Sequence, residues 1–223
     1  MKKYGIILSL GLVLGAFFQM GFYWQDSRAQ KVLNDFESKF ESIKDLSGNF
    51  TYGISNPSMS KETMRQGVQK SGNFKLKRSN KYVIDLEDQQ IYCNGDKIWI
   101  YLKDDEEVVI TDYEPDEGMN IEEIFSLYKT SATSRYDGVE KIHGTNCDKI
   151  YLVFKDNTLD YNQAMLWIGQ RSKLLEKAVT IDRRQTKTTY EFSNIKPNSG
   201  FADNVFQFDV AAHPNVDVYD ETE

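Results

Sequence analysis

The sequence predicts a mainly β fold of the α+β class, an antiparallel sheet or open barrel with helices placed against one face. Three observations lead to this fold class. Apolar and polar residues alternate in most segments, as they do in strands with one buried face. These segments follow a helix and are interrupted by a second, shorter helix. The length of 223 residues suits a single domain of this kind.

The composition narrows the class of protein further. Hydrophobic residues make up 40% of the chain and charged residues 27%, which excludes a disordered chain and a membrane protein with many spans. The net charge of −7 opposes contact with phosphate backbones, so no nucleic acid partner is expected. The 13 Tyr and 13 Phe residues fit either an aromatic core or the lining of a cavity.

The N-terminus has the pattern of an export signal. Lys2 and Lys3 precede an apolar run over residues 6–18, and the small residues Ser27 and Ala29 occupy the positions that a signal peptidase reads. The alternative is an uncleaved membrane anchor, but the apolar run is shorter than the roughly 20 residues of a spanning helix.

We therefore expect residues 1–29 to be a signal peptide and residues 30–223 to form one exported, periplasmic domain. The neighbourhood of the cleavage site lacks a cysteine, which argues against a lipid-modified N-terminus. Cys93 and Cys147 remain in the domain. An oxidising compartment permits a disulfide between them, but two ordinary cysteines at strand ends fit the sequence equally well.

The domain begins with an amphipathic helix and continues mainly as strands. Val32, Leu33, Phe36, Phe40 and Ile43 recur at helical spacing. Asn94-Gly95 is the strongest hairpin signal in the chain. The second helix follows Asn120, over residues 121–128. Strands are predicted at 49–54, 63–78, 81–87, 91–93, 97–102, 108–111, 136–142, 147–154, 163–168, 174–181, 187–194 and 206–210.

Arg78 stands out at the end of its predicted strand. By alternation, Phe74, Leu76 and Arg78 share one face, and that face is apolar. A buried arginine is costly unless it is paired. Either this end of the strand reaches solvent, or Arg78 makes a specific internal contact.

Catalytic motifs are missing from the sequence. His143 and His213 are its two histidines, and each lies in a turn or beside a proline. Zincin, nucleophile-elbow, P-loop and dinucleotide-binding patterns do not occur. We therefore predict no catalytic residue, no metal site and no cofactor, and we expect the protein not to be an enzyme.

Four segments, in order, resemble the LolA family, the periplasmic carriers of outer-membrane lipoproteins. The segments are LSGNFT at residues 46–51, GNFKLKR at 72–78, CNGDKIWIY at 93–101 and FQFDV at 206–210, the last followed by 216–218. The chain departs from the family pattern at Ser79, Asn94 and Asn215, where the family has Pro, Asp and Gly. These substitutions suit the same turns.

The resemblance implies an open half-barrel of antiparallel strands, with helices forming a lid over a concave apolar face. It also implies that Arg78 is a latch that hydrogen-bonds to the lid. We expect seven residues to line the cavity and five to belong to the lid, with ordinary core packing as the alternative for each. The cavity residues are Phe50, Tyr52, Phe74, Leu76, Tyr82, Ile84 and Trp99; the lid residues are Phe36, Phe40, Ile121, Ile124 and Phe125.

The function implied by the resemblance is to shield lipoprotein acyl chains in transit from the inner to the outer membrane. The expected partners are acylated lipoproteins, an inner-membrane lipoprotein-releasing transporter and an outer-membrane receptor, and the chain is expected to act as a monomer. One alternative is a periplasmic binder of another lipid or glycolipid on the same fold. Another is an esterase whose site is assembled only in space.

Overall fold

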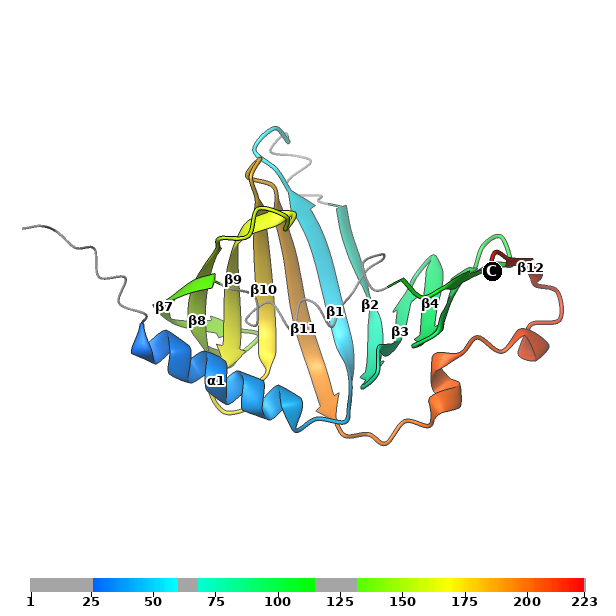
Figure 1. The fold of residues 1–223 in the computed structure, drawn as a ribbon, viewed down its shortest axis with the longest axis horizontal. Helices are drawn as coiled ribbons and strands as arrows, with labels where there is room; N and C mark the ends of the chain where they lie inside the picture. Colours follow the sequence, from blue (N-terminus) through cyan, green and yellow to red (C-terminus); the bar gives the residue numbers. More distant parts are fainter. Residues whose placement is uncertain (1–25, 60–67, 115–131, 223) are drawn as a thin grey trace, which may run out of the picture.

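The structure, a computed structural model, describes residues 26–59, 68–114 and 132–222. Within these ranges the chain forms one α-helix, α1 (Ser27–Glu41), two short 3-10 helices, η2 (Asp203–Phe206) and η3 (Val210–Ala212), and twelve strands (Figure 1). The strands are β1 (Asp45–Ser55), β2 (Val68–Lys77), β3 (Lys81–Leu86), β4 (Gln89–Asn94), β5 (Lys97–Leu102), β6 (Glu107–Asp112), β7 (Ala132–Ile142), β8 (Thr145–Phe154), β9 (Tyr161–Gly169), β10 (Leu175–Asp182), β11 (Lys187–Pro197) and β12 (Asp217–Asp220).

All twelve strands belong to one open sheet. Their order is β12-β6-β5-β4-β3-β2-β1-β11-β10-β9-β8-β7, so β1 joins an early half to a late half. Every neighbouring pair is antiparallel except β12, which runs parallel to β6. Strands β7 and β12 are the two edges, and the described strands do not close into a barrel. The predicted fold class, a mainly β open sheet, is confirmed.

The register sorts the side chains into two faces. Leu76, Tyr82, Cys93 and Ile98 lie opposite one another on neighbouring strands, and paired residues point to the same side of a sheet. All four belong to the main hydrophobic cluster, which also contains the apolar stripe of α1. We call this side of the sheet the inner face and the other side the outer face.

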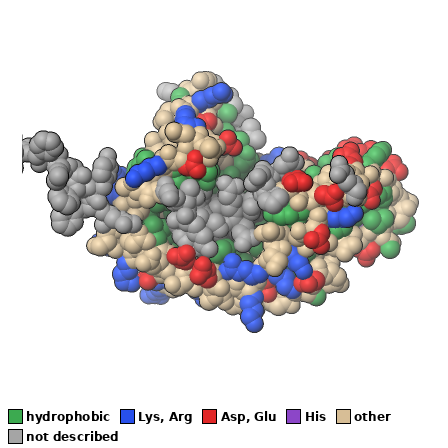
Figure 2. All heavy atoms as spheres, viewed as in Figure 1, with side chains coloured by type: hydrophobic (Ala, Val, Ile, Leu, Met, Phe, Trp, Pro, Cys, Tyr) green, Lys and Arg blue, Asp and Glu red, His purple; other side chains and the backbone are tan. Residues whose placement is uncertain are grey.

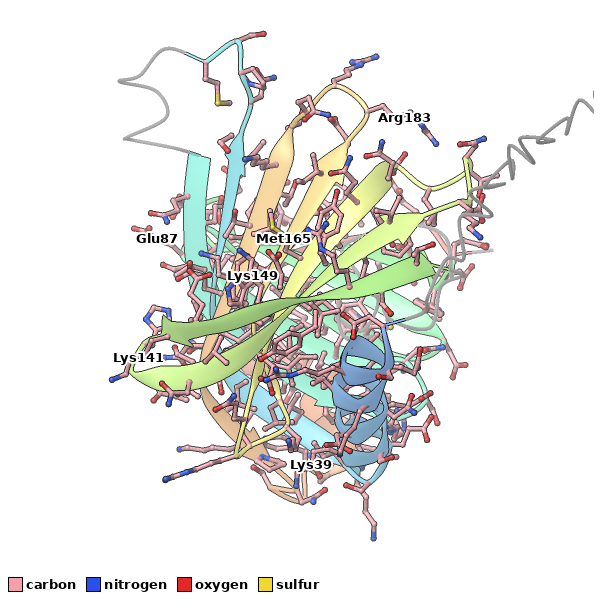
Figure 3. The ribbon with its side chains drawn as sticks, turned by 90° about the vertical axis from the view of Figure 1, so that its left-hand side faces the viewer. Lys39, Glu87, Lys141, Lys149, Met165 and Arg183 are labelled. Carbon is pink, nitrogen blue, oxygen red and sulfur yellow. The ribbon has the colours of Figure 1, made fainter. Side chains whose placement is uncertain are left out.

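Helix α1 lies across one end of the inner face. It runs over the lower ends of the late strands in Figure 1, and the view from the β7 edge places it on one side of the sheet (Figure 3). Asp26 caps it by accepting hydrogen bonds from the backbone N–H groups of Arg28 (2.9 Å) and Ala29 (3.2 Å). Its buried residues are Ala29 and four that the helical spacing predicts, Val32, Leu33, Phe36 and Phe40. Ile43, the fifth predicted residue, is also buried but lies just after the helix.

The C-terminal segment covers part of the outer face. Lys75, on that face, lies over the ring of Phe201 at 5.7 Å, and Phe208 packs against Trp99. Residues 206–210 were predicted as a strand, and this prediction is wrong. Phe206 and Phe208 are buried as alternation requires. The backbone, however, crosses the sheet in 3-10 turns, and it pairs with an edge only at β12.

The two cysteines lie in different clusters. Cys93 belongs to the main cluster on the inner face, whereas Cys147 packs with Trp167 and Val179 in a second cluster. Both are free thiols in the described structure. A disulfide within the chain, which the sequence leaves open, is therefore not formed.

Three predicted segments fall wholly or partly outside the described residues: residues 1–25 of the signal peptide, the start of the strand at 63–78 and the second helix at 121–128. Among the residues that are described, no helix is both long and apolar enough to cross a membrane.

Candidate apolar binding face

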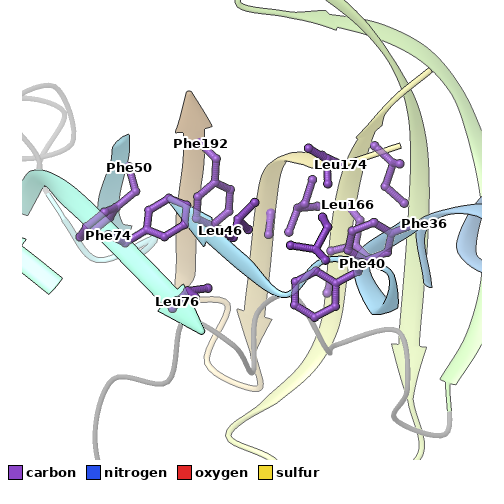
Figure 4. Packing of buried hydrophobic residues seen from close by; sticks show 14 of the residues in the cluster. Phe36, Phe40, Leu46, Phe50, Phe74, Leu76, Leu166, Leu174 and Phe192 are labelled. Atoms are coloured by element: carbon purple, nitrogen blue, oxygen red, sulfur yellow. The ribbon is translucent and has the colours of Figure 1, made fainter. Parts of the chain in front are cut away.

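Six of the seven predicted cavity residues lie together on the inner face. Phe50, Phe74, Leu76, Tyr82 and Ile84 belong to the main cluster, and Tyr52 packs against it. Figure 4 shows Phe50, Phe74 and Leu76 in one layer with Phe36 and Phe40, the two predicted lid residues on α1. The rings of Phe50 and Phe74 are 6.4 Å apart. The strand alternation seen in the sequence is sufficient to bring these side chains to one face.

The five cluster members are closely packed. Their exposed fractions range from 0% for Ile84 to 9% for Tyr82. The pocket beside α1 is lined by Phe40, Leu46, Leu76 and neighbouring residues, and it has a volume of only ≈ 20 Å³. A pocket for a small organic ligand usually holds roughly 300–1,000 Å³. The pocket beside α1 is therefore too small for an acyl chain while the helix stays in place.

Trp99 does not belong to this face. It pairs with Tyr92 on β4 and Ile110 on β6, on the outer side of the sheet. There it packs with Val108, Ile110 and Phe208 in a separate cluster. The prediction that Trp99 lines the concave face is therefore wrong. Strand β5 is apolar on both sides, so alternation could not decide which side carries the cavity.

Nine partly buried residues beside the main cluster were not predicted from the sequence as cavity residues. Their side chains pack against the main cluster but keep some surface exposed, which is where a ligand could make first contact. Tyr52, which was predicted, pairs with one of them: its ring is 5.4 Å from that of Tyr190. The sequence could have placed Ile91 and Ile100 on this face. The Asn94-Gly95 hairpin fixes the register of β4 and β5, and in that register Ile91 lies opposite both Ile84 and Ile100. The residues missed are Ile91, Ile100, Tyr113, Ala132, Tyr136, Leu159, Tyr161, Tyr190 and Ile195.

Arg78 holds the C-terminal end of α1. Its Nη2 donates to the carbonyl oxygen of Phe40 (2.5 Å) and its Nε to that of Ile43 (3.0 Å). The guanidinium also lies 5.0 Å from the centre of the Phe40 ring. The last carbonyls of a helix lack partners within the helix and carry partial negative charge, so a cation is well placed there. The side chain makes the specific contact that its position in the sequence suggested.

A polar network holds the other end of α1. The Arg28 guanidinium lies 3.7 Å over the Tyr136 ring and donates to the Tyr136 hydroxyl (2.8 Å). That hydroxyl donates to Asp148 (2.8 Å), while the backbone N–H of Tyr136 donates to Asp26 (2.8 Å). This last bond is the main reason that the pKa of Asp26 is lowered. The pKa of Tyr136 is raised, mainly because the side chain is partly buried and also because its hydroxyl donates to Asp148.

This network bears on the predicted cleavage site. Cleavage after Ala29 would remove Asp26 and Arg28 and cut inside α1, where Ala29 is 0% exposed. As the chain is folded, residues 26–29 belong to the domain. The pattern of small residues around Ala29 gave no sign of this, because Ser and Ala suit both a helix start and a peptidase site.

The other predicted lid residues, Ile121, Ile124 and Phe125, lie outside the described residues. Over the described ranges, no three His, Cys, Asp or Glu side chains are grouped so that they could hold a metal ion.

Arg183, labelled in Figure 3, lies at the far end of the late strands. Its guanidinium donates to the carbonyl oxygen of Asn157 (2.9 Å) and so connects the β10–β11 loop to the β8–β9 loop.

The profile of one family, described as outer membrane lipoprotein carrier protein LolA, matches residues 41–209, which is more than half of the chain. The chain belongs to the LolA family. The resemblance noted in the sequence is thereby confirmed, and the match covers β1 to β11 and includes Arg78. No curated protein matches the sequence.

Two solved structures show the same fold as this LolA family member. An uncharacterized conserved protein from Thermus thermophilus matches with a TM-score of 0.55 and 9% identity, covering 87% of this chain and 99% of that one. LprF from Mycobacterium bovis matches with a TM-score of 0.51 and 12% identity, covering 78% and 95%. A weaker match, to a LolA superfamily protein from Nitrosomonas europaea, has a TM-score of 0.41 and 11% identity, covering 82% and 98%.

Proposed function

We propose that this protein is an exported, periplasmic carrier that shields the acyl chains of lipoproteins and moves them from the inner to the outer membrane. The family assignment supports a carrier and binding role rather than catalysis. The observation that carries the proposal is the inner face itself: a broad apolar surface with α1 lying across one end, and with each end of that helix held by polar contacts.

The energetics of exchange favour a carrier that both loads and releases. Removing an acyl chain of about fifteen methylenes from a membrane exposes apolar surface worth on the order of 12 kcal/mol, at ~0.8 kcal/mol per methylene. Four large α1 side chains, Val32, Leu33, Phe36 and Phe40, are buried on the inner face. At about 1.5–3 kcal/mol each, they contribute ~6–12 kcal/mol. The free energy gained by burying α1 on the inner face is therefore comparable to that gained by burying an acyl chain there, so one can replace the other.

The proposal implies three kinds of partner. Acylated lipoproteins are the cargo, an inner-membrane lipoprotein-releasing transporter is the donor, and an outer-membrane receptor accepts the cargo. The protein would act as a monomer, because one copy supplies the whole inner face.

A release assay tests the proposal directly. The purified chain, starting at Asp26, is incubated with spheroplasts whose inner membrane holds acylated lipoproteins, and the soluble fraction is analysed. We expect a soluble complex that contains acylated lipoprotein. An unrelated acidic protein of similar size serves as the control and should release nothing. Absence of release from a donor membrane shown to be active would contradict the carrier role.

A second candidate function is binding of another lipid or glycolipid. The partly buried Tyr52, Tyr113, Tyr161 and Tyr190 favour it, because tyrosine offers an apolar ring together with a hydroxyl that can bind a polar head group. Mass spectrometry of lipids that copurify with the protein separates the two functions. A fatty acid or glycolipid recovered without any lipoprotein release would favour this alternative.

A further inference from the structure

Two buried side-chain oxygens lack a hydrogen-bond partner in the structure as described: Ser134 Oγ and Asn162 Oδ1. Ser134 is only 5% exposed. Buried hydroxyl and amide groups almost always have a partner, because an unpaired one loses its bonds to water without compensation. Each such atom therefore needs a physical explanation, and an absent ligand is one.

Ser134 lies on the inner face among apolar neighbours. It is opposite Leu152 on β8, which is opposite Ala164 on β9. Leu152 and Ala164 are 1% and 0% exposed and belong to the main cluster. The adjacent inner positions of β7 are Ala132 and Tyr136, both partly buried against the same cluster. The hydroxyl thus lies among apolar side chains of the proposed binding face.

Asn162 lies at the same corner of the sheet. It is the extra residue of a β-bulge, since Ile181 pairs with Gln163 and the next residue, Asp182, pairs with Tyr161. The Tyr161 ring meets that of Phe154 edge-on at 5.1 Å, and Phe154 pairs with Ala132, two residues from Ser134. Bulges re-aim side chains and recur beside functional sites.

We propose that Ser134 is a polar subsite that binds the carbonyl oxygen of an acyl ester or amide, with the acyl chain running along the inner face from this corner. The inference deepens the proposed function and rests on it. The Ser134 hydroxyl donates to the carbonyl, and Asn162 Oδ1 accepts from a hydroxyl or N–H group of the same head. The site would thus select acylated ligands over plain hydrocarbon chains.

A matched pair of ligands tests the subsite. A monoacylglycerol and the 1-O-alkylglycerol ether of equal chain length differ only in the ester carbonyl. Their affinities for the chain starting at Asp26 are measured by displacement of a fluorescent alkyl dye. We expect the ester to bind about three- to tenfold more tightly, the value of one neutral hydrogen bond. In Ser134→Ala, both ligands should bind with the affinity of the ether.

Thr133→Ala is the matched control, because Thr133 is the neighbouring β7 residue, opposite Val153 on the outer side. It should keep the preference for the ester. The melting temperature of Ser134→Ala should stay unchanged or rise, since the variant loses an unpaired hydroxyl. If Ser134→Ala does not fold, Ser134→Cys, which keeps an atom at the position of the hydroxyl oxygen but is only a weak donor, should still reduce the preference.

The outcomes distinguish failure of the subsite from failure of lipid binding. If the wild-type protein binds neither ligand, the proposed function fails. If it binds both ligands equally, or if Ser134→Ala weakens both to the same extent, lipid binding stands and the subsite is wrong.

Discussion

Arg78 is a clear example of one side chain that links the sheet to the helix covering it. Its two bonds go to the carbonyl oxygens of Phe40 and Ile43, which lie at the end of α1 and just after it. A guanidinium offers several donors in a fixed planar arrangement, so it can serve both oxygens at once. We propose that this contact acts as the latch that keeps α1 over the inner face.

Replacing Arg78 by Leu should loosen α1 while leaving the sheet folded. The side chain is exposed, so the loss should be about 1 kcal/mol rather than the larger value of a buried charged bond. The melting temperature should fall by roughly 2–4 °C, and a fluorescent alkyl dye should bind faster. Arg78→Lys keeps the positive charge but lacks the planar guanidinium, so its melting temperature and its rate of dye binding should lie between those of the wild type and Arg78→Leu. If Arg78→Leu lowers the melting temperature but leaves dye binding unchanged, Arg78 stabilises the end of α1 and does not control access to the inner face.

Individual residues differ in how far the sequence could place them. Arg78 was predictable, since alternation put a cation on an apolar face and so required a specific contact. Trp99 was not, because both sides of β5 are apolar and only the register with Tyr92 and Ile110 assigns its side. Ser134 gave no sequence signal at all. A serine in a strand is ordinary, and its unpaired hydroxyl is visible only once its neighbours are known.

At the level of elements, α1 depends on its first turn. Asp26 caps the helix and also accepts from the backbone of Tyr136, so the helix start is attached to the edge strand β7. Arg28 adds a second attachment through the Tyr136 ring and hydroxyl. These contacts indicate that the folded domain begins at or before Asp26.

A chain starting at Asp26 should therefore be more stable than one starting at Gln30. Loss of an N-cap costs about 1 kcal/mol, and loss of the Arg28 contacts adds to this. We expect the shorter chain to melt several degrees lower, at roughly 2–4 °C per kcal/mol for a domain of this size. In a chain starting at Asp26, Asp26→Ala should reproduce part of the loss. Equal melting temperatures for the two chains would show that the first turn is dispensable.

The C-terminal segment is an element that the sequence misassigned. Apolar residues alternate over 206–210 as in a strand, and alternation cannot reveal that the backbone has no neighbouring strand there. What fixes the segment is partly electrostatic. Asp203 in η2 pairs with Lys77 (2.5 Å) and Lys81 (2.8 Å), at the turn between β2 and β3. These two lysines lower the pKa of Asp203 to about 2.

This ion pair predicts an acid-sensitive attachment. A carboxyl whose pKa is lowered by folding stabilises the folded arrangement above its ordinary pKa of 3.8 and loses that contribution as pH falls toward about 2. Asp203 is solvent-exposed, so the effect should be local loosening rather than unfolding. The indole signal of Trp99, beneath Phe208, should shift between pH 4 and 2 in the NMR spectrum.

Asp203→Asn should remove this transition, and Asp217→Asn, in the exposed strand β12, should leave it in place. A Trp99 signal that follows the same pH profile in wild type and Asp203→Asn would mean that other carboxyl groups control the segment.

At the scale of the whole molecule, the two halves of the sheet differ in what covers them. α1 packs into the inner cluster of the late strands, while the C-terminal segment covers the outer face of the early strands. Acidic side chains gather at the far end of the early half, where the β5–β6 turn carries Asp104, Asp105 and Glu106 (Figure 2). An anionic membrane surface would repel that end, so the late half and α1 would face a membrane donor more readily.

Ligand loading should displace α1 rather than fill an existing cavity. The pocket beside Phe40 has a volume of only ≈ 20 Å³, which is far too small for an acyl chain. Hydrogen exchange of the backbone amides should therefore speed up over 27–41 when an acylated ligand binds, while the central strands β1 and β11 stay protected. Association should be slow and should level off at high ligand concentration, since helix opening precedes binding. Arg78→Leu should raise that limiting rate, because it weakens the closed arrangement alone. Tight binding with unchanged protection of α1 would place the ligand elsewhere on the inner face and leave the helix as ordinary core.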